Sequence, residues 1–442
     1  MNTLLHENKH TLKLAFPIIV SNLGQMLLGL TDTVMIGRVG TVELAAVALM
    51  NTLVHLFMVL GIGWAIAVSI QVSHAHGSSH ATGKRIALAH GFILSILLGI
   101  VVWIGMKCSM PLFSHLKQPV DVLQVMPEYL FWIAPSIAFM MPTMVLKSYA
   151  EAVNRPWGVF AIQLAGVALN VLLNAALIFG MWGFPEMGLA GAGLATFISR
   201  VLTLLGLICY LHGYFPDARL TGNRLYWKEC KTLMILATPI TSQMLMEFGA
   251  FATSAIFIGQ LGSLPMAAHQ IALTCAATTY MIPMGISNAV GIRVGHSLGS
   301  GSITRCRHIV MGAQSLTLFI MGLFAIFYLT LGEHIARVFS HEPDLIALTV
   351  SLLSITGIFQ LFDGVQIVSV GALRAMKDVA VPTAFCFIGY WLVAIPLGYG
   401  LGFGLKRGVT GFWMGLAAGL LMAACLMSVR LALLLRRNQR TL

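Results

Sequence analysis

Three acidic residues lie within long apolar runs of this 442-residue chain, where a charge is unusual. Glu247 lies in MLMEFGAF, Asp363 in FQLFDGVQ and Asp32 in GLTDTVMIG. A carboxylate at the middle of a membrane span costs about 3 kcal/mol on insertion scales, so such residues normally face a polar interior and have a function. Burial raises the pKa of a carboxyl group, and a neighbouring carboxylate raises it further. The three residues are therefore predicted to take up a proton near neutral pH or to bind Na⁺ through oxygen ligands. An ion pair with a buried base, or a hydrated position at a span end, is the alternative for each.

Polar amides accompany these carboxylates at helical spacing. Asn170 and Asn174 are four residues apart in LNVLLNA, so a helix places both on one face, where they extend a polar cavity or join two helices. Gln243 lies one turn before Glu247, and Gln270 follows in AAHQIAL. Both amides are predicted to line a cavity, with helix packing as the alternative.

The segments that position these residues are membrane spans. Hydrophobic residues make up 58% of the chain and charged residues only 9%, with a mean hydropathy of +0.88, which excludes a water-soluble fold. At about 20 apolar residues per span, the length allows roughly a dozen helices and no large soluble domain. Twelve apolar runs are predicted to be spans: 12–36, 46–72, 86–110, 125–147, 158–179, 188–212, 231–258, 265–293, 308–330, 345–371, 379–403 and 409–435.

The chain contains an internal repeat. A shift of 222 positions aligns LAFPI from Leu14 with LATPI from Leu236, and 11 of the 33 positions from Leu14 to Ala46 are identical. Two such halves of six spans have the same orientation, and a cavity between them suits a transporter. We expect an all-α polytopic protein with an N-terminal six-helix lobe (1–213), a cytoplasmic linker (214–230) and a C-terminal six-helix lobe (231–442).

The repeat is broken at the acidic positions. Glu247 aligns with Gln25, and Asp32 aligns with Ser254. Each half therefore carries an ionisable group where the other half has a neutral one. Glu247 and Asp363 belong to the same half, so they are predicted to converge on one cation.

The positive charges indicate orientation and not nucleic-acid binding. The 26 Lys and Arg residues against 15 Asp and Glu give a net charge of +11, but they lie in short segments between apolar runs and form no basic face. With a cytoplasmic N-terminus, 19 of them fall on the inner side and 6 on the outer side. Both termini are therefore expected in the cytoplasm. No G-x-x-x-x-G-K-[ST] motif for ATP is present, so an ion gradient is expected to supply the energy.

Over nearly its whole length the chain resembles the multidrug and toxic compound extrusion (MATE) family, in its NorM-like branch. The resemblance rests on four segments: LAFPI with TDTVMIGRVG, PITSQMLMEFGAF with QLGSLPMAAHQIAL, IRVGHSLG, and FQLFDGVQIVSVGALRAMKD. It implies a V-shaped pair of lobes in a bacterial inner membrane. The resemblance also implies that the protein exports dyes, fluoroquinolone-like drugs and similar amphipathic cations. No cofactor is implied beyond the coupling ion, Na⁺ or H⁺, and we expect a monomer surrounded by membrane lipid.

The resemblance also implies roles for individual residues. In the family, an acidic pair of the C-terminal lobe takes part in Na⁺ coupling, and this pair matches Glu247 and Asp363. The family's first-span aspartate is linked to protonation and drug release, and it matches Asp32. The chain departs from some relatives at Phe359, which replaces a tyrosine one turn before Asp363 and offers a cation–π contact in place of a hydroxyl ligand.

Three other functions are alternatives to export. A flippase of lipid-linked saccharides in the same superfamily would need a strongly basic cavity, for which only Arg200 is a candidate, and Arg200 could equally pair with a carboxylate or reach the interface. A major facilitator would carry a basic loop after the second span, where HAHGSSHATGKR stands. A membrane enzyme would need clustered Asp or His. The histidines of that loop, His74, His76 and His80, lack a Cys or Asp partner and are not expected to bind metal.

Overall fold

The computed structural model describes residues 2–113, 120–214 and 225–440, and all regular structure within them is helical. Within these residues twelve long helices follow one another, which confirms the predicted all-α fold of twelve helices. They are α1 (Asn2–Gly37), α2 (Thr41–Gly77), α3 (Ala81–Phe113), α4 (Val120–Ala152), α5 (Pro156–Phe179), α6 (Gly188–Tyr214), α7 (Trp227–Gly259), α8 (Ser263–Gly299), α9 (Ile303–Phe339), α10 (Pro343–Ala375), a composite helix made of α11 (Ala380–Cys386), η3 (Phe387–Ala394), α12 (Ile395–Tyr399) and η4 (Gly400–Gly404), and α13 (Gly408–Arg440). A short 3₁₀ turn, η2 (Met181–Gly183), lies between α5 and α6.

Ten of these helices are long and apolar enough to cross a membrane by length and composition, within the described residues. The other two are α7 and α8. Most helices extend beyond the apolar runs that predict them: α2 has 37 residues, whereas its apolar run covers 46–72. A helix of that length is about 55 Å long at 1.5 Å per residue, and the hydrocarbon core of a bilayer is about 30 Å thick. The polar ends of such helices therefore reach into the headgroup layers.

The repeat is visible in the helix boundaries. The paired helix ends Gly37 and Gly259, Thr41 and Ser263, and Gly77 and Gly299 are each 222 residues apart, the shift found in the sequence. A proline also lies inside both α1 and α7, at Pro17 and Pro239, again 222 residues apart. The duplication thus extends from the residues to the local structure.

Contacts divide the chain into two compact units, residues 20–241 and residues 1–19 with 242–442. The division falls inside α1 and α7, two or three residues after Pro17 and Pro239. A proline inside a helix removes one backbone hydrogen bond, so these are the positions at which the two helices bend most easily. Residues 215–224 of the predicted linker lie outside the described residues, and the lobe boundaries at 213 and 231 stay a prediction.

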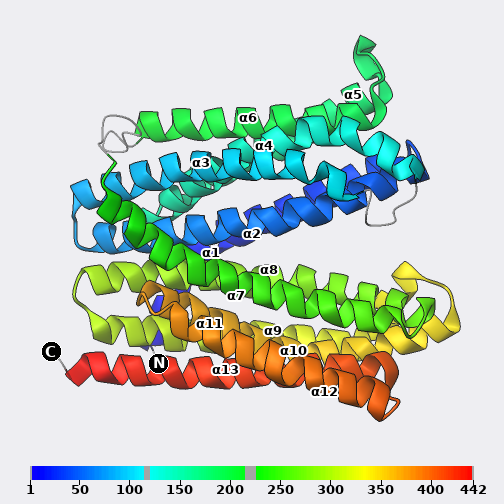
Figure 1. Ribbon diagram of the computed structural model, residues 1–442. Coiled ribbons are helices and arrows are strands. Elements are labelled where there is room, and N and C mark those ends of the chain that lie inside the picture. Colours follow the sequence, from blue (N-terminus) through cyan, green and yellow to red (C-terminus); the bar gives the residue numbers. More distant parts are fainter. Residues whose placement is uncertain (1, 114–119, 215–224, 441–442) are drawn as a thin grey trace. The chain divides into compact units, whose positions relative to one another are not determined.

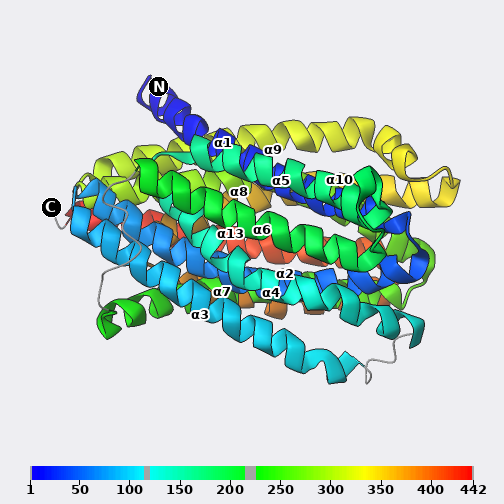
Figure 2. The ribbon, with the colours of Figure 1, turned by 90° about the horizontal axis from the view of Figure 1, so that it is seen from above.

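Each unit is built around one central helix. In residues 20–241, α4 packs against α2, α3 and α6, and α5 packs against α6 (Figure 1). In the other unit, α10 packs against α8, α9 and α13. Figure 2 gives a second view of the helices. The composite helix lies along α13 so closely that a Cβ atom at Gly415 would collide with the backbone of Gly398. Of the two central helices, α10 carries Phe359, Asp363 and Arg374 of the candidate sites.

Candidate functional site

The carboxylate of Glu247 on α7 is held by a tyrosine from the composite helix. Glu247 is partly buried, and its Oε1 atom accepts a hydrogen bond of 3.1 Å from the hydroxyl of Tyr390, which is fully buried in η3. The η3 segment is a π-helix, a wider turn that is often found at functional sites. The hydroxyl of Tyr390 also accepts a bond of 3.3 Å from Nε2 of Gln366 on α10. Three helices thus supply oxygen atoms to one buried region.

Asp363 of α10 completes this acidic cluster. Its side chain is 7% exposed, and none of the hydrogen bonds or ion pairs formed among the described residues reaches its carboxylate. The carboxylate of Glu247 acts on it electrostatically. Two neighbouring buried carboxylates repel each other when both are ionised, so a proton or a cation between them is favourable. This cluster, Glu247 with Asp363, Tyr390 and Gln366, is called the acidic cluster below.

A buried arginine lies close to the acidic cluster without forming an ion pair with it. Nη2 of Arg374, in the last turn of α10, donates a hydrogen bond of 3.2 Å to Oε1 of Gln243 on α7. Arg374 also interacts electrostatically with Glu247. The five ion pairs of the described residues do not include these two residues. Arg374 therefore offsets part of the negative charge and leaves the carboxylates available.

Aromatic rings cover one side of the acidic cluster. Phe359 is 3% exposed, and its ring makes edge contacts with Phe251 at 6.1 Å and Trp413 at 5.9 Å between centroids. Phe251 in turn lies 6.3 Å from the ring of Tyr390. Phe359 is thus part of a packed aromatic row that also contacts Tyr390 of the cluster through Phe251.

The other unit contains a separate polar chain that ends at Asp32. Nδ2 of Asn174 donates to Oδ1 of Asp32 at 2.5 Å and to Oδ1 of Asn170 at 3.1 Å. Nδ2 of Asn170 donates a hydrogen bond of 3.4 Å to the hydroxyl of Thr196 on α6. The two asparagines face one side of α5 because they are one helical turn apart. The first-span carboxylate is therefore oriented by a buried amide pair.

The hydrogen-bonded row that ends at Asp32 borders a cavity of about 240 Å³ within residues 20–241. Gln25, Asp32 and Asn170 line it, together with Arg200. Nη1 of Arg200 donates to the hydroxyl of Ser136 at 2.6 Å, and the guanidinium interacts electrostatically with Asp32. Among the described residues Arg200 and Asp32 form no ion pair within 4.0 Å. The cavity thus presents both a negative and a positive group beside apolar walls such as Val54, Met58, Ile133 and Met140.

The predicted residues fall into two groups and one exception. Glu247, Asp363, Gln243 and Phe359 lie together in one unit, and Gln25, Asp32, Asn170 and Asn174 lie together in the other. Gln270 is exposed on α8, and within the described residues its side chain joins neither group.

Sequence reasoning missed Tyr390, Gln366 and the burial of Arg374. A hydroxyl inside the apolar run CFIGYWLVA was a usable but weak signal for Tyr390. No group of three or more His, Cys, Asp or Glu side chains within the described residues is arranged to hold a metal ion, and this includes His74, His76 and His80.

Comparisons with known proteins agree with this architecture. A model of the MatE family matches residues 17–176 and 239–400. The chain is 31% identical to the multidrug resistance protein NorM of Burkholderia vietnamiensis, over 95% of this chain and 92% of that protein. It is 32% identical to a protein of Bradyrhizobium diazoefficiens named "Probable multidrug resistance protein NorM", over 99% of this chain and 95% of the relative.

Solved structures share the fold at lower identity. The Vibrio cholerae MATE transporter VcmN in its bent form superposes with a TM-score of 0.89 at 18% identity, covering 99% of both chains. The eukaryotic MATE transporter AtDTX14 superposes with a TM-score of 0.89 at 19% identity, also covering 99% of both chains.

Proposed function

Because this chain belongs to the MATE family (MatE), and is thus a multi-pass membrane transporter and not an enzyme, we propose that it is a secondary antiporter that exports small amphipathic organic cations in exchange for Na⁺ or H⁺. The proposed cargo includes cationic dyes and fluoroquinolone-like drugs, and the name of the NorM relatives supports this choice. The proposed location is a bacterial inner membrane, with both termini in the cytoplasm and the chain acting as a monomer.

The observation that carries the proposal is the carboxylate of Asp363, which is buried beside Glu247 without a hydrogen-bond or ion-pair partner among the described residues. An isolated buried carboxylate is costly unless it is neutralised. A proton neutralises it directly, and Na⁺ does so with the oxygen atoms of Glu247, Tyr390 and Gln366 as further ligands. In either case the coupling ion stabilises the form of the acidic cluster that it occupies.

The organic cation is proposed to bind in the cavity of residues 20–241. Asp32 supplies the negative charge, Asn170 and Asn174 orient it, and Gln25 adds a polar edge. The methionine and aliphatic walls of this cavity suit flat apolar ligands because Met side chains adapt to different shapes. Arg200 beside Asp32 limits how much positive charge the cavity accepts, so binding and release of a cation depend on the balance between these two groups.

The alternative, a flippase for lipid-linked saccharides, requires several basic groups around a pyrophosphate. The cavity of residues 20–241 is lined by Arg200, whose guanidinium is bonded to Ser136 and offset by Asp32, and by the imidazole of His55. This balance of charge favours a cation over a pyrophosphate as the cargo.

Ethidium efflux from cells that lack their own pumps tests the proposal. An imposed inward Na⁺ or H⁺ gradient should accelerate efflux in cells that express the chain and leave empty-vector cells unchanged. If neither gradient accelerates ethidium efflux, while the protein is present in the membrane, antiport of organic cations is refuted.

A further inference from the structure

A pocket between α9 and α13 lies apart from both candidate sites. It has a volume of about 190 Å³ and combines two arginines, Arg307 and Arg436, with two neutral polar side chains, Gln314 and Ser428. The remaining lining residues are apolar: Val310, Met311, Leu431, Ala432 and Leu435. Among the described residues no carboxylate lines this pocket, which is called the arginine pocket below.

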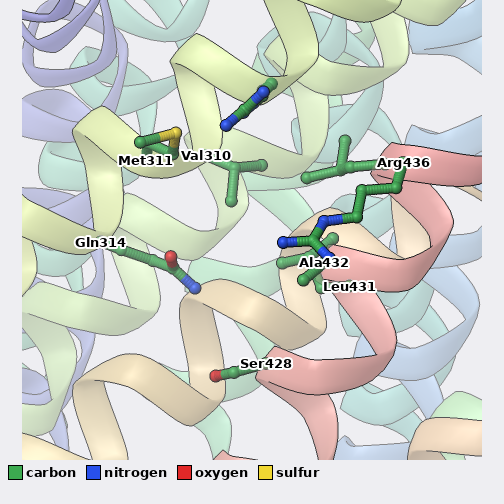
Figure 3. Close-up of a pocket in the computed structure, with 9 residues that line it drawn as sticks. Val310, Met311, Gln314, Ser428, Leu431, Ala432 and Arg436 are labelled. Atoms are coloured by element: carbon green, nitrogen blue, oxygen red, sulfur yellow. The ribbon is translucent and has the colours of Figure 1, made fainter. Parts of the chain in front are cut away.

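The charged groups of the arginine pocket are free to bind an anion. Arg307 and Arg436 are both exposed, and among the described residues neither forms an ion pair or a hydrogen bond. The neighbouring arginines differ, since Arg305 pairs with Glu7 at 3.2 Å and Arg430 pairs with Asp378 at 2.8 Å. Figure 3 shows Arg436 and Gln314 pointing into the pocket from opposite sides. Two guanidinium groups at one pocket are suited to a phosphate, whose oxygen atoms match their planar geometry.

The depth of the polar groups fits a lipid that stands parallel to the helices. Arg307 is near the start of α9 and Arg436 is near the end of α13, so the two antiparallel helices bring them to the same end of the unit. Gln314 lies seven residues from Arg307, and Ser428 lies eight residues from Arg436, in both cases toward the middle of the helix. At 1.5 Å per residue these two polar side chains are about 10–12 Å deeper than the arginines. Both helices exceed the thickness of the hydrocarbon core, so the arginines lie at the level of the headgroups.

The surroundings of the arginine pocket are those of a lipid-facing groove. Met311 is 44% exposed, and on α13 Val429 and Leu433 are 59% and 56% exposed. In a membrane protein such exposed apolar side chains face acyl chains. An occupant can therefore place an anionic head between the arginines, an ester group near Gln314 and Ser428, and its tails along these residues.

We propose that the arginine pocket is a binding site for the phosphodiester headgroup of an anionic phospholipid, with Arg307 and Arg436 bound to the phosphate. Basic pockets between membrane helices bind such headgroups in other proteins. Free inorganic phosphate shares the chemistry of the headgroup but would gain nothing from the apolar walls. A phospholipid is therefore the occupant that uses the whole pocket.

Native mass spectrometry of the purified full-length chain tests this site. The protein is incubated with equal amounts of phosphatidylglycerol and phosphatidylethanolamine that have the same acyl chains. Wild-type protein should retain phosphatidylglycerol preferentially, and the double variant Arg307→Gln with Arg436→Gln should bind it roughly 30-fold more weakly, because each arginine near a membrane contributes about a fivefold gain. The matched control is Arg437→Gln with Lys231→Gln, two exposed residues outside the pocket, which should behave as wild type.

A second variant keeps the charges and fills the space. Ala432 is exposed and lines the pocket, so Ala432→Phe should obstruct it without disturbing the buried core, and should also lose phosphatidylglycerol. The proposal is overturned if the pocket variants retain the lipid as wild type does, or if the control loses it to the same extent. It is equally overturned if inorganic phosphate displaces the lipid, because the ligand is then a soluble phosphate.

Discussion

The hydroxyl of Tyr390 donates a hydrogen bond of 3.1 Å to the carboxylate of Glu247, and this contact joins two residues that are 143 positions apart in the sequence. It places an ionisable group of α7 against the π-helical part of the composite helix. Any change in the charge of Glu247 therefore alters its hydrogen bond with Tyr390 of the composite helix. If the acidic cluster binds the coupling ion as proposed, this contact connects ion binding to the packing of the composite helix.

Tyr390→Phe removes this donor and leaves the ring in place. A hydrogen bond to a charged group contributes about 1.5–3 kcal/mol, so the apparent affinity for the coupling ion should change by tenfold or more. The measurement is the dependence of ethidium efflux on the Na⁺ and H⁺ concentrations in proteoliposomes. Tyr399→Phe is the matched control, because Tyr399 is exposed on the same composite helix. A Tyr390→Phe protein indistinguishable from this control would show that the hydroxyl has no part in coupling.

Asn174→Leu tests the polar chain at Asp32. The substitution removes the donor at 2.5 Å from Asp32 and breaks the bond to Asn170, so Asp32 loses its fixed orientation. Binding of an organic cation, measured by fluorescence titration with ethidium, should weaken about tenfold. Thr203→Val is the control, since Thr203 lines the same cavity but donates its hydroxyl to the backbone of Ser199. Equal affinities in both variants would exclude Asp32 and its amide partners from cation binding.

Glu7→Gln tests the buried ion pair near the start of α1. Glu7 and Arg293 are 6% and 8% exposed and form an ion pair, which Arg305 extends at 3.2 Å. Removal of one partner of a buried pair costs about 3–5 kcal/mol, because the other charge is left without compensation. The apparent unfolding temperature in detergent should fall by several degrees.

The surface pair Glu333 with Arg337 provides the comparison for that measurement. Its atoms are 2.6 Å apart, but both side chains are more than half exposed. Glu333→Gln should change the free energy of unfolding by no more than about 1 kcal/mol. Equal thermal shifts for Glu7→Gln and Glu333→Gln would mean that the pair of Glu7 with Arg293 does not stabilise the unit.

Much of the fold is predictable from the sequence, because a helix in lipid must be apolar over about 20 residues and a duplicated chain repeats its boundaries. The exact helix ends are not, since polar residues continue α2 beyond the apolar run at 46–72. Pro17 and Pro239 are visible in the sequence, but nothing in the local pattern says that the compact units divide beside them.

The candidate sites are only half predictable. Asp32, Glu247 and Asp363 are found because a charge at lipid depth is costly, and Asn174 is found from its helical spacing to Asn170. Tyr390 is not found, because an apolar run with one hydroxyl resembles any other span and the contact depends on a π-helical turn. The partners of a buried side chain come from distant helices, and periodicity within one helix does not contain that information.

Ion-driven efflux in proteoliposomes that contain Glu247→Gln together with Asp363→Asn tests the central claim most directly. If the acidic cluster couples ion entry to drug export, the double variant should still bind ethidium in the cavity of residues 20–241, while an imposed Na⁺ or H⁺ gradient should no longer accelerate its efflux. Gradient-driven efflux at the wild-type rate in this variant would contradict the claim.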